Sequence, residues 1–202
     1  MSEHYFTAQP ATPGQVRPLR VRLADRDVTV ETAAGVFSPD ALDKGTAVLL
    51  RTAPPPSTSG RLLDLGCGWG PIALTLGLLA PEALVYAVDV NERSVDLVRR
   101  NAATLRLDGV RAVLPHQVPT DLEFDAIWSN PPIRVGKAVL HDLMLSWLPR
   151  LAVGGAAYLV VQKNLGSDSL QRWLTSNLPQ RYAVRRYASD KGFRVLEVRR
   201  GA

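Results

Sequence analysis

One stretch, residues 62–71, constrains the fold of this chain more than any other. It begins as an apolar run, which is typical of a buried parallel strand, and the run is followed by a glycine-rich turn. The residues that define the pattern are an aspartate, three glycines at alternate positions and a proline suited to the first turn of a helix: Asp64, Gly66, Gly68, Gly70 and Pro71. A strand, a glycine turn and a helix N-terminus place bare backbone N–H groups where a polar ligand can reach them. The stretch therefore predicts an α/β fold with a ligand site at this turn.

The spacing of the glycines favours one kind of ligand over another. A dinucleotide fingerprint has glycines at the first, third and sixth positions of the turn, but the sixth position here is Pro71, which has no N–H. An NAD-dependent dehydrogenase is therefore disfavoured. Asp64 ahead of the G-x-G-x-G run suits a ligand with hydroxyl groups and a cationic amine. The stretch resembles the opening motif of the class I S-adenosylmethionine (SAM) methyltransferases, and the alternative is a glycine turn that binds nothing.

Composition bounds the compartment and the class of protein. The chain has 202 residues, 46% of them hydrophobic and 21% charged, which suits one domain with a small extension. The single Cys67 excludes an intrachain disulfide and a cysteine-based zinc site, and it fits a reducing compartment. The polar N-terminus is unlike a signal peptide, and no apolar run approaches the roughly 18 residues that span a bilayer. We therefore expect a cytoplasmic protein with no membrane span and, because His4 and His141 lack partners at ligand spacing, no metal.

The net charge of +5 and the pI of about 9.7 are compatible with a nucleic-acid partner. Basic residues gather near the C-terminus, where two acidic residues, Asp190 and Glu197, accompany eight basic ones. The eight are Arg172, Arg181, Arg185, Arg186, Lys191, Arg194, Arg199 and Arg200. This bias fits either RNA contact or an ordinary solvated face.

Strand and helix patterns alternate along the chain. Residues 1–18 are predicted to be an extended, proline-containing arm, and alternating apolar residues predict a hairpin over 19–30. Ser38-Pro39 is predicted to cap a helix that reaches about Arg51, with an interruption near Gly45-Thr46. Residues 54–60 form a proline-rich linker, which divides the chain into an N-terminal arm, hairpin and helical cover (1–60) and a core domain (61–202).

The core domain is predicted to be a doubly wound, mostly parallel sheet, because its strands alternate with helices and end in a hairpin. The further strands are expected at 84–88, 110–114, 124–128, 156–161, 182–187 and 193–198, and the further helices at 93–105, 137–148 and 168–174. Ligands in such a sheet sit at the carboxyl ends of the strands. Asp64, Asp89 and Asn130 all fall at such ends. We expect Asp89 to accept hydrogen bonds from both ribose hydroxyls, with Asp64 facing the methionine amine.

Asn130-Pro131-Pro132 carries the expected chemistry of transfer. Two prolines directly after a strand make the backbone rigid and leave the Asn side chain and the Pro131 carbonyl pointing out of the sheet end. An exocyclic amine is a poor nucleophile because its lone pair is delocalised. Two carbonyl acceptors on its N–H bonds favour a pyramidal nitrogen and stabilise the positive charge that grows during transfer. The alternative interpretation is a rigid turn without a catalytic role.

Three motifs together resemble the methyltransferase small domain family, best known for ribosomal small-subunit RNA (guanine-N2) methyltransferases of the RsmC type. They are residues 64–70, residues 89–91 and residues 129–137, and His4-Tyr5-Phe6 and residues 35–38 resemble its short members. The resemblance implies a seven-stranded sheet with one antiparallel strand and a SAM cofactor. It implies a guanine N2 in small-subunit ribosomal RNA as the methylated group. The cofactor-binding residues that it implies are Phe37, Thr46, Asp64, Gly66, Cys67, Gly68, Gly70, Asp89, Val90 and Asn130.

Two departures from the family pattern affect the site. Amino-methyltransferases often carry an aromatic residue after Asn-Pro-Pro, but here Ile133 can pack and not stack, so selection of the base is left to Trp128, Phe37 or residues outside these motifs. The usual acidic or amide residue for the adenine amine is missing after the third strand, where His116 and Gln117 are candidates. Ile133, Arg134, Lys137 and Trp128 are the predicted substrate-binding residues, with Arg134 and Lys137 on phosphates.

Two other functions remain open from the sequence. A protein glutamine or adenine N6 methyltransferase uses the same Asn-Pro-Pro logic, although Ile133 weighs mildly against both. A non-catalytic assembly factor that binds SAM or RNA belongs to a different class, and the intact Asn130-Pro131-Pro132 weighs against it.

Overall fold

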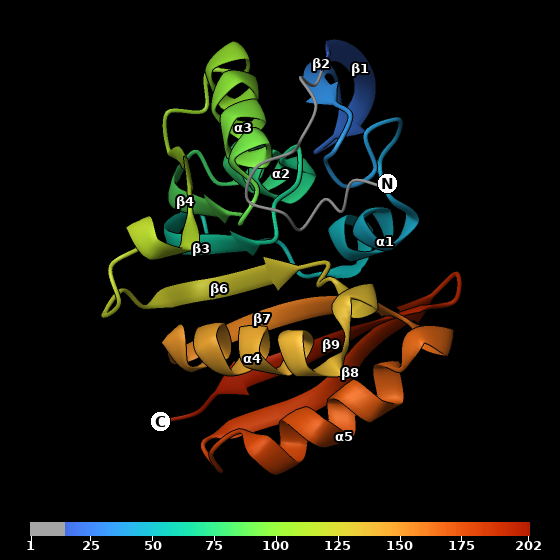
Figure 1. Cartoon of the computed structure of the whole chain (residues 1–202). Coiled ribbons are helices and arrows are strands. Elements are labelled where there is room, and N and C mark those ends of the chain that lie inside the picture. The colour runs from blue at the N-terminus through green and yellow to red at the C-terminus, as the bar shows by residue number, and fades with distance from the viewer. Residues whose placement is uncertain (1–14) are drawn as a thin grey trace.

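The computed structural model describes residues 15–202, so most of the predicted arm, including His4-Tyr5-Phe6, lies outside the described residues. Within that range seven strands form one sheet in the order β5-β4-β3-β6-β7-β9-β8, and two more form a separate hairpin (Figure 1). β9 runs antiparallel to both of its neighbours, and the other pairings in the sheet are parallel. The predicted fold class, a doubly wound and mostly parallel seven-stranded sheet with a hairpin extension, is confirmed.

The sheet strands in spatial order are β5 (Val110–Val113), β4 (Glu82–Val88), β3 (Ser59–Leu65), β6 (Phe124–Ser129), β7 (Leu151–Gln162), β9 (Phe193–Arg200) and β8 (Tyr182–Asp190). The hairpin consists of β1 (Val16–Leu23) and β2 (Arg26–Ala33). The α-helices are α1 (Lys44–Thr52), α2 (Pro71–Leu79), α3 (Glu92–Thr104), α4 (Lys137–Trp147) and α5 (Ser167–Asn177). Short 3-10 turns occupy Pro115–Gln117, Ile133–Val135, Leu148–Arg150 and Lys163–Leu165.

Alternation along β3 decides what covers each face of the sheet, because successive side chains of a strand point to opposite faces. Leu63 and Leu65 belong to the core beneath α4 and α5, which lie in front of the sheet in Figure 1. Leu62 belongs to the core beneath α1, α2 and α3 on the other face. Asp64 shares that second face, and this register directs its carboxyl group toward the N-terminus of α2.

The N-terminal hairpin docks on α2 and α3 through an apolar face and a few polar side chains. Leu23 and Val30 are buried in a core shared with these helices. The side chain of Asn101 on α3 accepts from the backbone N–H of Glu31 at 2.6 Å and donates to its carbonyl at 2.9 Å, as a neighbouring strand would. The hairpin is therefore held against the core domain by packing and by paired backbone groups.

The start of α1 corrects the predicted cap. Ser38 has a φ of +46° and its Oγ donates to the carbonyl of Ala41 at 2.8 Å, so Ser38-Pro39 forms a turn and not a helix start. The helix begins at Lys44 because Asp43 caps it, accepting from the backbone N–H of Thr46 at 2.9 Å. The interruption predicted near Gly45-Thr46 is therefore the first turn of α1.

Two other predicted boundaries are wrong. Residues 16–18, assigned to the arm, belong to β1 and pair with residues 31–33, since a two-stranded sheet tolerates Pro18 at its edge. The strand predicted over 156–161 begins earlier, at Leu151, so Gly154-Gly155 lies inside β7. A Cβ at Gly155 would lie 2.9 Å from the carbonyl oxygen of Asp125, so glycine allows β7 to pass close to β6 there.

Candidate active site

The turn between β3 and α2 uses backbone conformations that favour glycine. Gly66, Gly68 and Gly70 have φ values of +80°, +55° and +97°. The backbone N–H groups of Gly66 and Cys67 donate to the Val88 carbonyl at 2.8 and 3.1 Å, which ties the turn to the end of β4. A Cβ at Gly66 would meet no atom within 4 Å, so the backbone at this position borders open space.

Two buried acidic groups lie beside this turn. Asp64 is 0% exposed, and its Oδ2 accepts from the backbone N–H of Ala73, in the first turn of α2, at 2.9 Å. Its Oδ1 is buried without a hydrogen-bond partner among the described residues. Burial raises the pKa of Asp64 to about 8, and burial also raises the pKa of the Cys67 thiol well above its usual value. Cys67 is therefore an unreactive packing residue, whereas Asp64 has a free oxygen that a cationic group would stabilise.

Asp89 joins the glycine turn to the start of α3. Its Oδ2 accepts from the backbone N–H of Gly68 at 2.9 Å, and its Oδ1 accepts from the backbone N–H of Asn91 at 2.9 Å. Burial raises the pKa of Asp89, while the hydrogen bonds from Asn91 and Gly68 act in the opposite direction. Hydrogen bonds from the Ser94 side chain and the Val90 backbone also act to lower the pKa of Asp89. Asp89 is thus held in place beside the glycine turn.

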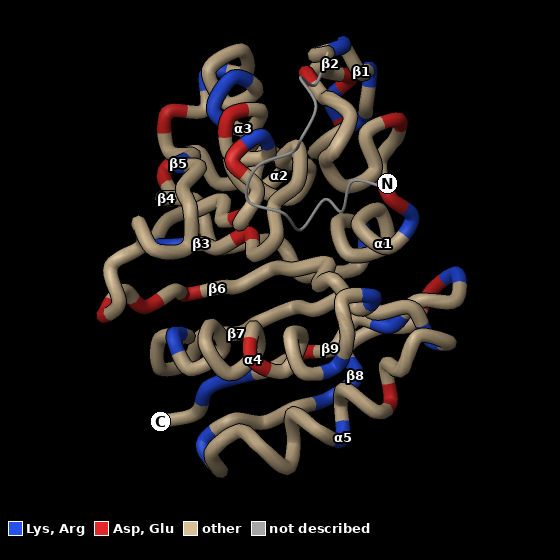
Figure 2. The backbone as a smooth tube through the Cα atoms, viewed as in Figure 1, with Lys and Arg blue, Asp and Glu red and all other residues tan. Residues whose placement is uncertain are grey.

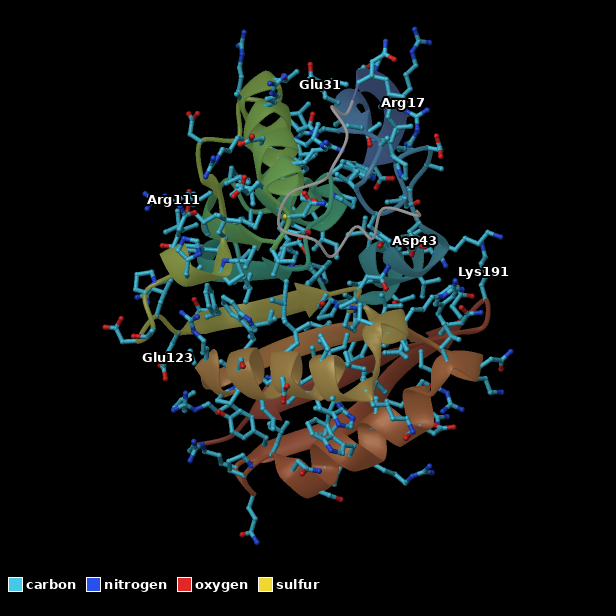
Figure 3. The ribbon with its side chains drawn as sticks, in the orientation of Figure 1. Arg17, Glu31, Asp43, Arg111, Glu123 and Lys191 are labelled. Atoms are coloured by element: carbon cyan, nitrogen blue, oxygen red, sulfur yellow. The ribbon has the colours of Figure 1, made fainter. Side chains whose placement is uncertain are left out.

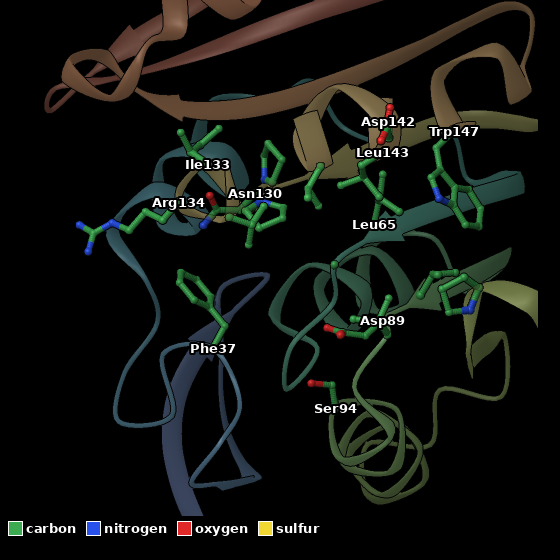
Figure 4. A pocket seen from close by; sticks show the side chains of 18 of the residues that line it. Phe37, Leu65, Asp89, Ser94, Asn130, Ile133, Arg134, Asp142, Leu143 and Trp147 are labelled. Carbon is green, nitrogen blue, oxygen red and sulfur yellow. The ribbon is translucent and has the colours of Figure 1, made fainter. Parts of the chain in front are cut away.

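A pocket of about 930 Å³ lies at the carboxyl ends of β3, β4 and β6, within the size range of small-molecule sites. Figure 4 shows Asn130, Ile133 and Phe37 at one end and Trp147 at the other, with Asp89 between the two ends. The structure brings nine of the predicted site residues to its wall. They are Phe37, Gly66, Asp89, Val90, Asn130, Pro131, Pro132, Ile133 and Arg134.

The side chain of Asn130 is held from behind by α1. Its Nδ2 donates to Oδ2 of Asp43 at 2.8 Å and to Oγ1 of Thr46 at 3.0 Å. Thr46 is buried and not on the pocket wall, so it contacts the site through Asn130. Among the residues that the structure describes, none donates to Oδ1 of Asn130. Both donors of the amide are therefore used within the protein, and its acceptor remains available.

Some predicted residues lie elsewhere. Trp128 is 2% exposed and packs edge-on against Tyr158 in the core, so it has no surface to offer a base. His116 is exposed and does not line the pocket, whereas its neighbour Pro115 does. The Gln117 side chain accepts from a backbone N–H of its own turn at 2.9 Å. These placements correct the assignment of Trp128 to the substrate and of His116 to the cofactor.

The other predicted residues surround the pocket without lining it. Lys137 is exposed at the first position of α4, next to the wall formed by Arg134. Asp64, Cys67, Gly68 and Gly70 lie in or beneath the glycine turn.

The sequence interpretation missed several wall residues. Asp43 and Phe193 come from segments far from the motifs, and Leu143 and Trp147 come from α4. Helical spacing, i and i+4, could have indicated that Leu143 and Trp147 share one face of the predicted helix. An aspartate three residues before Thr46 is a helix-cap signal that could have identified Asp43. No sequence signal indicates that Phe193, on β9, reaches this pocket.

Most of the C-terminal basic residues form ion pairs with acidic residues of the same chain. Within the described range, five of the eight form ion pairs, in which Arg185 and Arg199 contact Glu197, Arg186 and Arg194 contact Asp168, and Arg200 contacts Glu123. Burial acts to raise the pKa of Glu197, but hydrogen bonds from its two arginines outweigh it and the pKa is lowered. Figure 2 shows Lys and Arg at the hairpin end as well as along β8 and β9, and Figure 3 shows Lys191 at the tip of the β8–β9 turn. The cluster does not form one free basic face.

No three His, Cys, Asp or Glu side chains within residues 15–202 are placed to hold a metal ion. No helix there is both long enough and apolar enough to cross a membrane.

The fold and the site together define a class. A sheet of this strand order, a glycine turn after β3, an acid after β4 and Asn-Pro-Pro after β6 are the parts of a class I methyltransferase. The residues present fit SAM, because Gly66 borders open space, the carboxylate of Asp89 lines the pocket beside it, and Oδ1 of Asp64 beneath the turn has no hydrogen-bond partner among the described residues.

Comparison with known proteins gives the family. Residues 27–197 match the model of the methyltransferase small domain. The chain is 31% identical to the uncharacterized protein YbxB of Bacillus subtilis (strain 168), over 99% of this chain and 100% of that protein. It is 36% identical to ribosomal RNA small subunit methyltransferase C of Serratia proteamaculans (strain 568), over 66% of this chain but 40% of that protein.

A solved structure shows the same fold. The 16S rRNA N2 methyltransferase RsmC of T. Thermophilus, in complex with AdoMet and guanosine, superposes with a TM-score of 0.77 at 24% identity, over 93% of this chain and 51% of that one. The chain thus spans about half the length of the RsmC proteins that it matches. It belongs to the methyltransferase small domain family, and it is a SAM-dependent methyltransferase.

Proposed function

We propose that the protein methylates the exocyclic N2 amine of a guanine in small-subunit ribosomal RNA. One observation carries the proposal: Asn130-Pro131-Pro132 lines the same pocket as Asp89 and Gly66. The acceptors that a target amine needs therefore lie beside the residues that suit the cofactor. The relatives named ribosomal RNA small subunit methyltransferase C support the choice of RNA, and the guanosine bound in the solved RsmC supports the choice of base.

The cofactor end of the pocket is assigned to residues with matching chemistry. Asp89 accepts from the ribose hydroxyls, Oδ1 of Asp64 faces the methionine amine directly or through water, and Gly66 allows close approach of the backbone. Val90 supplies apolar wall next to Asp89, and Phe37 supplies apolar wall nearer Asn130 (Figure 4). When bound, SAM supplies an electrophilic methyl group on a sulfonium sulfur.

The target end stabilises the amine as it becomes positively charged. Oδ1 of Asn130 and the carbonyl oxygen of Pro131 accept hydrogen bonds from the two amine protons, and both acceptors gain strength as charge develops on nitrogen. The prolines keep the carbonyl in place, and Ile133 packs against the face of the base. A guanine must leave its base stack to reach these groups, so an unpaired or loosened guanine is the expected substrate.

Contacts outside the pocket are assigned to the phosphate backbone. Arg134 on the pocket wall and Lys137 at the start of α4 are exposed, and neither forms an ion pair among the described residues. Basic side chains in such positions bind phosphates and set the register of the RNA. A ribosomal substrate places this activity in the cytoplasm.

The test is mass spectrometry of ribosomal RNA nucleosides from cells with and without the protein. We expect N2-methylguanosine in small-subunit RNA to decrease in the deletion strain and to return with the wild-type gene but not with Asn130→Ala. An unchanged nucleoside profile would contradict the proposal. Loss of N6-methyladenosine, or of methylglutamine in the proteome, would replace guanine by the corresponding target.

A further inference from the structure

Asp43 makes two hydrogen bonds through one oxygen. Its Oδ2 accepts from the backbone N–H of Thr46 at 2.9 Å, which caps α1, and from Nδ2 of Asn130 at 2.8 Å. The second bond joins residues 87 positions apart in the chain. Capping needs the first bond and not the second, so the contact with Asn130 is an additional function of this side chain.

The two ends of an amide side chain have opposite hydrogen-bonding character. Nδ2 donates and Oδ1 accepts, and a rotation of 180° exchanges their positions with little change in shape. With Oδ1 toward the pocket, Asn130 can accept from an amine; with Nδ2 there, it would present a donor to a donor. Only one orientation of the amide therefore suits an amine, and the hydrogen-bonding groups behind the amide determine which orientation is adopted.

Asp43 and Thr46 are both acceptors on the protein side of Asn130. A flipped amide would place its oxygen 2.8 Å from a carboxylate oxygen, a repulsive contact between two acceptors, and would lose a charge-assisted hydrogen bond. Asp43 is the stronger determinant of the two, because the Thr46 hydroxyl can also donate and would accept either orientation.

We propose that Asp43 is a positioning residue that orients the Asn130 amide so that its oxygen faces the target amine. The inference rests on the proposed function of Asn130. It gives α1 a role in catalysis, since the cap of this helix also sets the polarity of a group at the end of β6.

The test uses Asp43→Ser, which retains a good helix cap but is too short to reach Asn130. We expect kcat to fall about 10- to 100-fold, below the roughly 100- to 1000-fold cost of losing a preorganised group altogether, while the Kd for SAM stays within about twofold because that end of the pocket is untouched. Thr46→Val should have a smaller effect. Asp40→Ser is the matched control, since Asp40 lies in the same loop, is exposed and forms a surface ion pair with Arg17.

A double-mutant cycle shows whether Asp43 acts through Asn130. Adding Asp43→Ser to Asn130→Ala should cost no further activity, because the group to be oriented is already gone. Equal losses in both backgrounds would overturn the positioning role. Wild-type turnover in Asn130→Ala would instead overturn the proposed function, so the two failures are distinguishable.

Side-chain NMR tests the contact without substrate. In protein with ¹⁵N-labelled asparagine, the Nδ2 protons of Asn130, assigned by their absence in Asn130→Ala, should be protected from solvent exchange. Asp43→Ser should exchange them faster and Asp40→Ser should not. Should Asp43→Ser fail to fold, wild-type protection of both protons supports the contact, and rapid exchange of both in the wild type overturns it.

Discussion

The two ends of the pocket are built in different ways. The end proposed to bind the cofactor consists of one short stretch, the glycine turn after β3, together with Asp89 at the end of β4, and most of its geometry lies in the backbone. The end proposed to bind the target is assembled from side chains of α1, β9 and the segment after β6. From this difference we can predict which substitutions affect the site only through their own backbone and which affect it from another element of the fold.

A site made of backbone depends on conformations that few residues can adopt, whereas a site made of side chains depends on neighbours that orient them. Substitutions at the cofactor end should therefore alter affinity or stability. Substitutions at the target end should alter turnover, even when they lie on another element. The following predictions test this contrast.

Asn130→Ala should have the largest effect, a loss of turnover of about 100- to 1000-fold, because one preorganised acceptor is removed from the developing charge. SAM affinity should change far less, since the proposed SAM contacts are made by Asp89 and Gly66 and not by Asn130. Single-turnover methyl transfer at saturating SAM measures the first quantity and a binding titration the second. A parallel loss of binding and rate would contradict the separation of the two ends.

Asp89→Ala should weaken SAM by about 10- to 100-fold, from the loss of one or two charge-assisted hydrogen bonds. Asp96→Ala, on the exposed side of α3, is the control and should bind as the wild type does. Calorimetry gives both affinities, and thermal unfolding checks that the anchor to Gly68 is not the cause. If Asp89→Ala bound SAM with the affinity of the wild type, the assignment of Asp89 to the ribose hydroxyls would be wrong.

Two glycine substitutions in the same turn should differ in their effects on the free energy of unfolding and on the affinity for SAM. Gly70→Ala forces a side chain into φ +97°, with its Cβ 2.9 Å from Cγ2 of Val98, and should lower the free energy of unfolding by about 1–3 kcal/mol. Gly66→Ala is also strained, at φ +80°, but its Cβ enters open space, so it should cost less unfolding free energy than Gly70→Ala and should weaken SAM by about tenfold. Denaturant unfolding and calorimetry measure the two effects, and the reverse pattern would show that Gly66 does not border the cofactor.

Asp64 should produce the smallest effect, a pH dependence. With a pKa of about 8, the carboxyl group is mostly protonated at pH 7. A cationic amine beside it would lower this pKa, so binding of SAM should release up to one proton at pH 7 in the wild type, and affinity should rise as pH increases toward 8. Calorimetry in buffers of different ionisation enthalpy counts the protons.

Asp64→Asn is the matched variant, because it keeps an acceptor for Ala73 and cannot titrate. It should release fewer protons than the wild type, with the amine of SAM contributing equally to both. The sign for stability is opposite to that for binding. Because the folded pKa lies above the ordinary value of 3.8, the wild type should lose unfolding free energy as pH rises from about 4 to about 8. If both proteins released the same number of protons on binding SAM, Asp64 would not be the residue that faces the amine.

The glycine turn and the start of α2 could be predicted from the sequence because their signals are local. Positive-φ glycines, a proline at the first turn of α2 and an acid at the end of a strand are all set by residues within a few positions of each other. Helix boundaries failed where two caps competed: Ser38 looked like a cap, but Asp43 makes the hydrogen bond that starts α1.

Trp128 and His116 are residues whose position relative to the site could not be predicted from the local sequence. Both lie near strand ends in the sequence, yet the alternation of β6 turns Trp128 into the core, and the 3-10 turn after β5 presents Pro115 to the pocket in place of His116. A one-residue difference in phase moves a side chain from a site to a core.

The sequence by itself determined the doubly wound sheet, the glycine turn, the two strand-end acids and Asn-Pro-Pro, because each depends on a short-range pattern of hydrophobicity and backbone preference. The tertiary structure alone decided that Asp43 and Thr46 hold the Asn130 amide, that Phe193 lines the pocket and that C-terminal arginines pair with Glu197 and Asp168. These contacts join segments tens of residues apart, and which side chains meet across such distances is set by the packing of whole elements.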